Sequence, residues 1–269
     1  MNNNFCIIVS TMNLKDYNLH EKMNINSNCI VINQCSQNSI KQHLNKDKNL
    51  LYIDTTDRGL SKSRNLGIRS CSSKHFLIAD DDLVYNDNVE SIVIDAFKKY
   101  SDAAVIGFYV RSTNIERPTN KPNKSGRLTR IESMKLSSFQ LAFNNDLLIK
   151  SGISFNEVFG AGSGNVKMGE ENILLYKLIS KGYKVYYHDV IIGEVNHAET
   201  TWFTGIDSKY LSDRGAIFYE MSKKLYMIYI LQFSIRKRYL YKKEFSLFQS
   251  IKLMYDGAKK QQLLNNVRN

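Results

Sequence analysis

Three consecutive aspartates follow an apolar segment in HFLIADDD, which ends at Asp80, Asp81 and Asp82. Adjacent carboxylates repel one another, and a bound cation relieves that repulsion. Oxygen ligands of this kind suit hard divalent cations, so we expect Mg²⁺ or Mn²⁺ at this position. The alternative is a solvated turn, in which aspartate is common.

Two other segments carry groups suited to a phosphate-linked substrate. In GLSKSRN, Ser63 and Arg64 lie near the start of a predicted helix, where a helix N-terminus and a guanidinium favour a phosphate or a nucleobase edge. In MGEENILLYKL, Glu170 or Glu171 is a candidate general base for an acceptor hydroxyl. The structural alternatives are an ordinary surface helix for the first segment and stabilisation of a helix N-terminus for the second.

The segment EVNHAETTWF supplies two further candidates. His197 is a candidate metal ligand, although a lone histidine is more often only hydrogen-bonded. Trp202 is a candidate for an acceptor or sugar pocket. GAGSG at 160–164 lacks the GxGxxG spacing, and no P-loop, HExxH, GxSxG or zinc-spaced Cys/His set occurs. Metal-assisted chemistry on a phosphate-linked substrate remains.

The elements that position these residues alternate between apolar strands and helices in the first half of the chain. This order predicts an α/β fold with a mostly parallel sheet flanked by helices. Ligands of such sheets bind beyond the carboxyl ends of the strands, so the residues that follow each strand are candidate contacts. The predicted strands are 5–9, 29–32, 50–53, 76–78 and 104–108, and the predicted helices are one beginning at Lys62 with Ser61 as its cap and one over 88–100. The candidate contacts after the first three strands include Ser10, Thr11, Asn33 and Asp57.

The second half of the chain predicts a long loop and then mixed elements. The loop covers 111–135 and holds both prolines. After it we expect a strand within 139–143, helices at 146–150 and 170–180 with Gly182 ending the latter, and strands at 184–187 and 190–195.

Length and charge indicate one catalytic body with a basic tail. A chain of 269 residues has room for one sizeable core, and we expect a catalytic domain at 1–206 and a helical tail at 207–269. Residues 221–269 hold eleven Lys or Arg and two acidic residues, a net charge of +9 out of +11 for the chain. This asymmetry argues against nucleic-acid wrapping. Basic amphipathic helices suit an anionic membrane surface, or they pack on the catalytic domain with a solvated Lys face.

Cysteine usage and hydropathy predict a reduced, cytosolic setting. The four cysteines form no CxxC pair, and the N-terminal segment lacks the pattern of a secretory signal. The longest uncharged apolar run in the tail is too short to cross a bilayer. We therefore expect a cytoplasmic protein, with contact at the inner face of the cell membrane as an option.

These motifs, in their order and spacing, resemble family 2 glycosyltransferases of the GT-A type, including bacterial enzymes of surface polysaccharide synthesis. The resemblance covers about 5–203 and rests on VSTMN, GLSKSRN, LIADDD and GEEN. It implies a GT-A domain that binds a nucleotide-sugar donor and uses Mn²⁺ or Mg²⁺.

Carried over by position, the resemblance assigns roles to individual residues. The aspartates form the DxD element: Asp82 ligates the metal, and Asp80 or Asp81 holds the donor ribose or diphosphate. Arg64 and Ser63 lie along the nucleotide, with Thr11 near the base. Glu171 matches the position of the catalytic base, a place that is often Asp. Many members carry an Asp pair after the second strand, where this chain has Asn33 and Gln34, so uridine preference is less secure.

The resulting prediction is an inverting, metal-dependent transferase of the hexosyltransferase type. It would move a sugar from a nucleotide diphosphate donor, a UDP-sugar by preference, to a hydroxyl of a glycan or lipid-linked acceptor. Two other classes are kept as alternatives: a metal-dependent nucleotidyltransferase, and a non-catalytic module that binds anionic polymer or membrane. The identity of the sugar, the acceptor, the linkage and the oligomeric state do not follow from the sequence.

Overall fold

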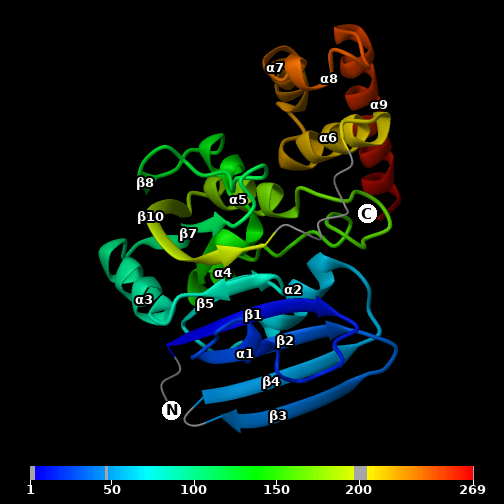
Figure 1. Cartoon of the computed structure of the whole chain (residues 1–269). Coiled ribbons are helices and arrows are strands. Elements are labelled where there is room, and N and C mark those ends of the chain that lie inside the picture. Colours follow the sequence, from blue (N-terminus) through cyan, green and yellow to red (C-terminus); the bar gives the residue numbers. More distant parts are fainter. Residues whose placement is uncertain (1–3, 46–47, 197–204, 269) are drawn as a thin grey trace.

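A computed structural model of the chain describes residues 4–45, 48–196 and 205–268. Its centre is a ten-stranded mixed sheet with the path order β3-β4-β2-β1-β5-β9-β7-β10-β6, and β8 pairs with β10 beside this path. The sheet is flanked by helices, and the C-terminal helices gather at the end of the molecule opposite β3 (Figure 1). The predicted α/β class with a mostly parallel sheet is confirmed.

The strands are β1 (Phe5–Met12), β2 (Asn28–Gln34), β3 (Ser39–Asn45), β4 (Lys48–Thr55), β5 (His75–Asp80), β6 (Leu83–Tyr85), β7 (Ala103–Ser112), β8 (Gly126–Arg127), β9 (Leu141–Asn144) and β10 (Lys184–Val195). The helices are α1 (Leu19–Lys22), α2 (Leu60–Arg69), α3 (Val89–Lys99), α4 (Asn145–Ser151), α5 (Glu170–Ser180), α6 (Ser208–Met221), α7 (Tyr226–Arg236), α8 (Arg238–Tyr241) and α9 (Leu247–Arg268), with short 3₁₀ turns η1 (Glu132–Lys135) and η2 (Ser138–Gln140).

The parallel strands β4, β2, β1 and β5 form the half of the sheet that the sequence predicts best. β1, β2 and β5 are short aliphatic runs buried on both faces, as parallel strands require, and β4 is buried along its second half. The register sets Ser10 opposite Asp80 and Thr11 opposite Asn33. The carboxyl ends of β1, β2 and β5 therefore bring their polar residues to one edge, where ligands of such sheets bind.

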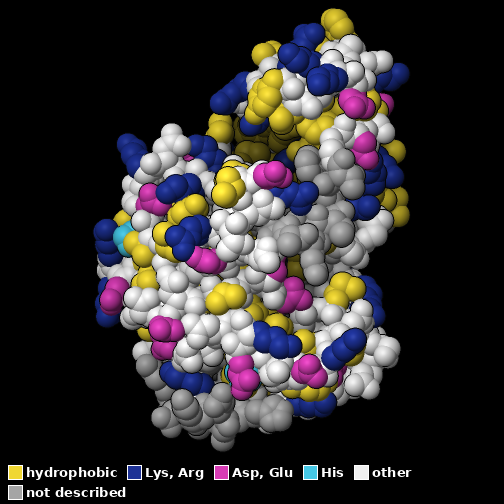
Figure 2. All heavy atoms as spheres, in the orientation of Figure 1, with side chains coloured by type: hydrophobic (Ala, Val, Ile, Leu, Met, Phe, Trp, Pro, Cys, Tyr) yellow, Lys and Arg dark blue, Asp and Glu magenta, His cyan; other side chains and the backbone are white. Residues whose placement is uncertain are grey.

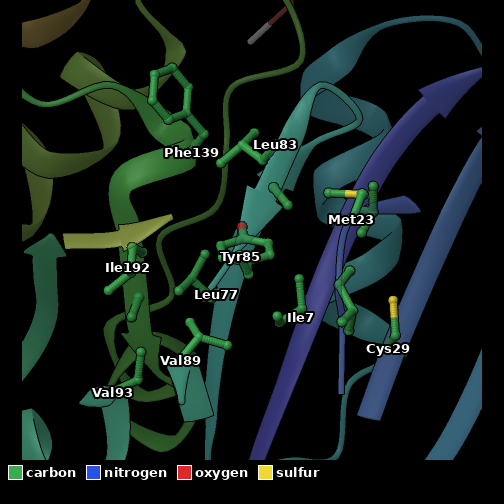
Figure 3. Packing of buried hydrophobic residues seen from close by; sticks show 14 of the residues in the cluster. Ile7, Met23, Cys29, Leu77, Leu83, Tyr85, Val89, Val93, Phe139 and Ile192 are labelled. Carbon is green, nitrogen blue, oxygen red and sulfur yellow. The ribbon is translucent and has the colours of Figure 1, made fainter. Parts of the chain in front are cut away.

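Two apolar clusters cover the two faces of the sheet. One of them joins Ile7 of β1, Leu77 of β5 and Tyr85 of β6 to Val89 and Val93 of α3 (Figure 3). The other packs β-strand residues against α5. This burial on both faces fixes the strand ends that carry the polar groups.

Several local predictions differ from the structure. Ser61 does not cap a helix at Lys62: α2 begins at Leu60, after Gly59 at φ +122°, and the Ser61 hydroxyl donates to the carbonyl of Phe159 at 2.6 Å. The two strands predicted at 184–187 and 190–195 are one strand, β10, whose pairing with β7 shifts register near His188 and Ile191. Gly182 does take the predicted left-handed conformation at φ +91°.

The C-terminal helices are attached to the rest of the chain by a shared apolar cluster. Ile173 and Tyr176 of α5 pack in one buried group with Leu211 and Ile217 of α6. A hydrogen-bonded ion pair between Lys177 Nζ and Glu220 Oε1, 2.5 Å apart, joins the same two helices. None of the helices in the described ranges is both long and apolar enough to cross a membrane.

Candidate active site

The aspartate motif lies at the carboxyl ends of the parallel strands, the edge of the sheet where ligands are expected to bind. Asp80 is the last residue of β5, and Asp81 and Asp82 form the turn into β6. The Thr11 hydroxyl, at the end of β1, donates to Asp81 Oδ2. Next to it, the buried hydroxyls of Ser63 and Ser10 are 2.9 Å apart. The strand ends thus join residues that the sequence analysis placed in three separate motifs.

Asp82 is half-buried and shares its turn with two other carboxylates. Burial is the main cause that raises the pKa of Asp82, and the charges of Asp80 and Asp81 raise it further, to about 6. A carboxylate in this position favours a neighbouring positive charge.

Arg64 is the fully buried centre of the site. Its guanidinium donates from Nη1 to Glu170 Oε1 at 2.7 Å and from Nη2 to Asp80 Oδ1 at 2.9 Å. Nη2 also donates to the Ser138 hydroxyl at 2.7 Å. Arg64, predicted to lie along a nucleotide, therefore ties the end of β5 to the start of α5 through a protein-internal ion-pair network.

The two glutamates at the start of α5 have different surroundings. Gly169 precedes them at φ +85°, and a Cβ there would overlap Ile217, so the approach of α5 to α6 requires glycine. Glu170 is buried against Arg64. Glu171 is half-buried, and burial followed by the charge of Glu170 raises its pKa to about 8. Glu171 is the carboxylate of the pair that Arg64 does not hold in an ion pair within the described residues.

A pocket opens at this junction between α2, η2 and α5. It brings together the predicted residues Arg64, Asp80, Glu170 and Glu171. Its remaining lining is Leu60, Ser137, Ser138, Phe139, Ala161, Lys167, Met168 and Gly169. The sequence analysis did not single out Ser137 and Ser138. The sequence feature that could have identified this turn is the capping box that Ser137 forms with Gln140 around η2.

The nucleoside side of the edge contains Asp54, a carboxylate that follows the third predicted strand. Asp54, the buried residue near the end of β4, accepts hydrogen bonds from Asn33 Nδ2 at 2.7 Å and from the Tyr17 hydroxyl at 2.8 Å. The Ser39 hydroxyl also donates to it. Burial opposes ionisation of Asp54, but these hydrogen bonds lower its pKa below the ordinary value. Asp57, which was predicted, is exposed in the loop that follows β4.

Two predicted residues, His197 and Trp202, lie outside the described residues. The described chain reaches Asn196, whose backbone N–H donates to the carbonyl of Asp82 at 3.3 Å. Across the residues that the structure describes, which leave out 197–204, no three His, Cys, Asp or Glu side chains form a metal-binding group.

Comparisons with known proteins identify the family of the chain. The family model described as glycosyl transferase family 2 matches residues 17–156, which is 140 of the 269 residues. No curated protein matches the sequence.

Among solved structures, the chain is similar to S. aureus TarS residues 1-349, with a TM-score of 0.60 at 12% identity, covering 96% of this chain and 92% of that one. The TarS complex with UDP-GlcNAc matches with a TM-score of 0.65 at 15% identity, covering 94% and 80%. The TarS complex with UDP matches with a TM-score of 0.61 at 13% identity, covering 96% and 83%. At these identities the likeness shows the fold, and it confirms the GT-A architecture that the motifs predict.

Proposed function

The chain belongs to glycosyl transferase family 2 and is a glycosyltransferase, and from this premise we propose that it is an inverting enzyme of bacterial surface polysaccharide synthesis. It transfers a sugar from a nucleotide diphosphate donor to a hydroxyl of a glycan or lipid-linked acceptor. The observation that carries this proposal is the pocket in which Asp80 and Glu171 face one cavity, with Asp81 and Asp82 following at the same strand end. Family membership favours this reaction over nucleotidyl transfer and over a non-catalytic binding module.

The donor is a UDP-sugar in this proposal. S. aureus TarS, which has the same fold, is known in complexes with UDP and UDP-GlcNAc. The proposed nucleoside contacts are polar groups at the ends of β1, β2 and β4, among them Thr11, Asn33 and Asp54, which strand register brings to one edge of the sheet. Ser10, Ser63 and Asp57 complete the proposed donor side.

The residues present fit a divalent cation. The raised pKa of Asp82, caused by burial and by two adjacent carboxylates, is the condition that a bound cation reverses. Asp82 and Asp80 would hold Mn²⁺ or Mg²⁺, and His197 is proposed as a third ligand from the sequence alone. When bound, the ion neutralises charge on the diphosphate as it leaves.

In the proposed reaction Glu171 acts as the base. Its carboxylate takes the proton from the acceptor hydroxyl while that oxygen forms a bond to the anomeric carbon. The bond from the anomeric carbon to the diphosphate oxygen breaks on the opposite side, and the diphosphate leaves with the electron pair. Glu170 is unsuited to this role because its carboxylate is engaged by Arg64.

The acceptor-binding residue is proposed from its position in the sequence. Trp202 is the proposed acceptor contact, and a lipid-linked acceptor would place the enzyme in the cytoplasm at the inner face of the cell membrane. Nucleic acid is not a proposed partner, since the basic residues are concentrated in the tail rather than around the pocket.

Thermal unfolding with nucleotides tests the proposal. The wild type and Asp82→Asn are melted with UDP, GDP, CDP or ATP, each with and without Mn²⁺. A ligand at 100 times its dissociation constant stabilises by about 2.7 kcal/mol, so a Mn²⁺-dependent rise in Tm with UDP is expected for the wild type and not for Asp82→Asn. A rise in Tm with ATP alone would instead support nucleotidyl transfer. No rise in Tm with any nucleotide would contradict both the glycosyltransferase and the nucleotidyltransferase hypotheses.

A further inference from the structure

Helix α7 has apolar or aromatic side chains at eight of its eleven positions, although one of its faces is exposed. Its inner face packs on α6, with ring centroids of Phe218 and Phe233 5.9 Å apart, and buries Ile230 completely. An apolar face of a helix is expected to be covered by another apolar surface. Its outward face nevertheless exposes three aliphatic side chains: Ile228 (59%), Leu231 (44%) and Ile235 (66%).

The exposed stripe continues into α8. Tyr239 and Leu240 are 62% and 48% exposed, one turn beyond Ile235. Tyrosine has an apolar ring and a polar hydroxyl, which suits a boundary between water and an apolar phase. We call the five residues Ile228, Leu231, Ile235, Tyr239 and Leu240 the α7–α8 surface.

The chain around the α7–α8 surface carries cations and no anions. Between Glu220 and Glu244 no acidic residue occurs in the sequence. All seven basic side chains of this stretch are exposed: Lys223, Lys224, Arg236, Lys237, Arg238, Lys242 and Lys243. Figure 2 shows hydrophobic and basic side chains interspersed over this end of the molecule.

We propose that the α7–α8 surface docks on an anionic lipid bilayer. The aliphatic and aromatic side chains enter the boundary between headgroups and acyl chains, and the flanking cations lie against anionic headgroups. A second copy of the chain fits the surface less well, because the facing cations would repel. A nucleic acid would engage the cations but leave the apolar stripe in water. The bilayer contact goes beyond the transfer reaction, and it stands or fails independently of it.

Sedimentation of the full chain with vesicles tests this docking. We expect binding to phosphatidylcholine vesicles that contain phosphatidylglycerol, weak binding to phosphatidylcholine alone, and release by high salt. Each cation near an anionic surface contributes about a fivefold increase in partitioning. Arg236→Gln with Lys237→Gln is therefore expected to lower the bound-to-free ratio about 25-fold. Ile228→Ser with Ile235→Ser lowers it at every salt concentration.

Matched controls separate docking from general effects. Lys124→Gln with Lys150→Gln removes two exposed cations elsewhere, and Ile115→Ser with Ile149→Ser removes two exposed aliphatic side chains elsewhere. These variants are expected to bind vesicles like the wild type. An unchanged Tm for every variant shows that folding is intact, and sugar transfer to a soluble acceptor measures the reaction separately.

Three results would overturn the docking. One is equal binding to vesicles with and without phosphatidylglycerol, and another is equal loss of binding in the control variants. The third is a soluble dimer, seen by analytical ultracentrifugation, that Ile228→Ser with Ile235→Ser dissociates while vesicle binding is absent in the wild type. In that case the surface is an interface between copies of the chain.

Discussion

At the scale of single residues, the two adjacent glutamates of α5 differ because Arg64 reaches only one of them. The sequence analysis identified both as candidates but did not distinguish their surroundings. The ion pair that separates them joins residues 106 positions apart, so no local pattern reports it. The same holds for Asp54, whose contact with Asn33 spans two strands.

Replacement of Glu171 by glutamine is expected to abolish most activity without loss of fold. The missing proton transfer lowers kcat about 10²- to 10⁴-fold, with little change in donor KM. Wild-type activity should rise with pH and level off above the pKa of Glu171, which is about 8. Steady-state kinetics between about pH 6 and pH 9.5 measure both effects. Activity that falls across this range would contradict the assignment.

Stability gives a second readout of the same residue. Between the ordinary carboxyl pKa of about 4.3 and the folded value, the folded state binds more protons than the unfolded state. The free energy of unfolding therefore decreases as pH rises toward about 8, where Glu171 ionises in the folded protein. Glu171→Gln removes this decrease, so its Tm should exceed that of the wild type increasingly from acidic to alkaline pH. Glu116→Gln, at an exposed site, is the control and should follow the wild type.

Arg64 is expected to be a major source of local stability. Removing one partner of a buried ion pair leaves an uncompensated charge and costs about 3–5 kcal/mol. Arg64→Met should lower the free energy of unfolding by this amount in urea titrations. Combining Arg64→Met with Glu170→Gln removes a stranded carboxylate as well, so the double variant should be less destabilised than the sum of the single variants. Strict additivity would mean that the Arg64–Glu170 pair contributes little.

At the scale of elements, local periodicity predicts where helices and strands lie but not how tightly they approach. Helices α3 and α5 and the central strands were predicted close to their observed bounds. The edge strand β3 was missed, since its polar sequence SIKQHLN gives no apolar alternation. The contact between α6 and α9 was also missed, although it depends on two glycines visible in the sequence.

The contact between α6 and α9 at these two glycines is expected to tolerate no larger side chain. A Cβ on Gly215 of α6 would overlap the backbone of Met254, and a Cβ on Gly257 of α9 would overlap the backbone of Ser212. Alanine favours a helix over glycine by about 1 kcal/mol, yet here it must push two backbones apart. Gly215→Ala should therefore destabilise the chain by about 1–3 kcal/mol, measured by urea unfolding. Lys260→Ala, exposed on α9, controls for helix propensity and should have little effect.

At the scale of the whole molecule, most of the net positive charge lies after the predicted boundary at 206/207, but one buried apolar cluster includes residues from both sides of it. The +9 of residues 221–269 follows from the sequence, because charge is a property of composition. The attachment of the tail to the catalytic body could not be predicted from the sequence. It depends on tertiary packing of Ile173 and Tyr176 of α5 with Leu211 and Ile217 of α6. Apolar residues at these positions are equally consistent with a helix that packs only within its own tail.

The shared cluster predicts that the catalytic body and the tail unfold together. Ile217 is fully buried at their junction, so Ile217→Ala should lower the free energy of unfolding by about 2–5 kcal/mol through lost contacts and a cavity. If the two parts form one cooperative unit, calorimetry of the wild type and of Ile217→Ala shows one transition each, with equal calorimetric and van't Hoff enthalpies. Independent parts would give two transitions, of which Ile217→Ala shifts only one. A single shifted transition would mean that the tail, beyond any docking role, holds the N-terminus of α5 and therefore Glu171 in place.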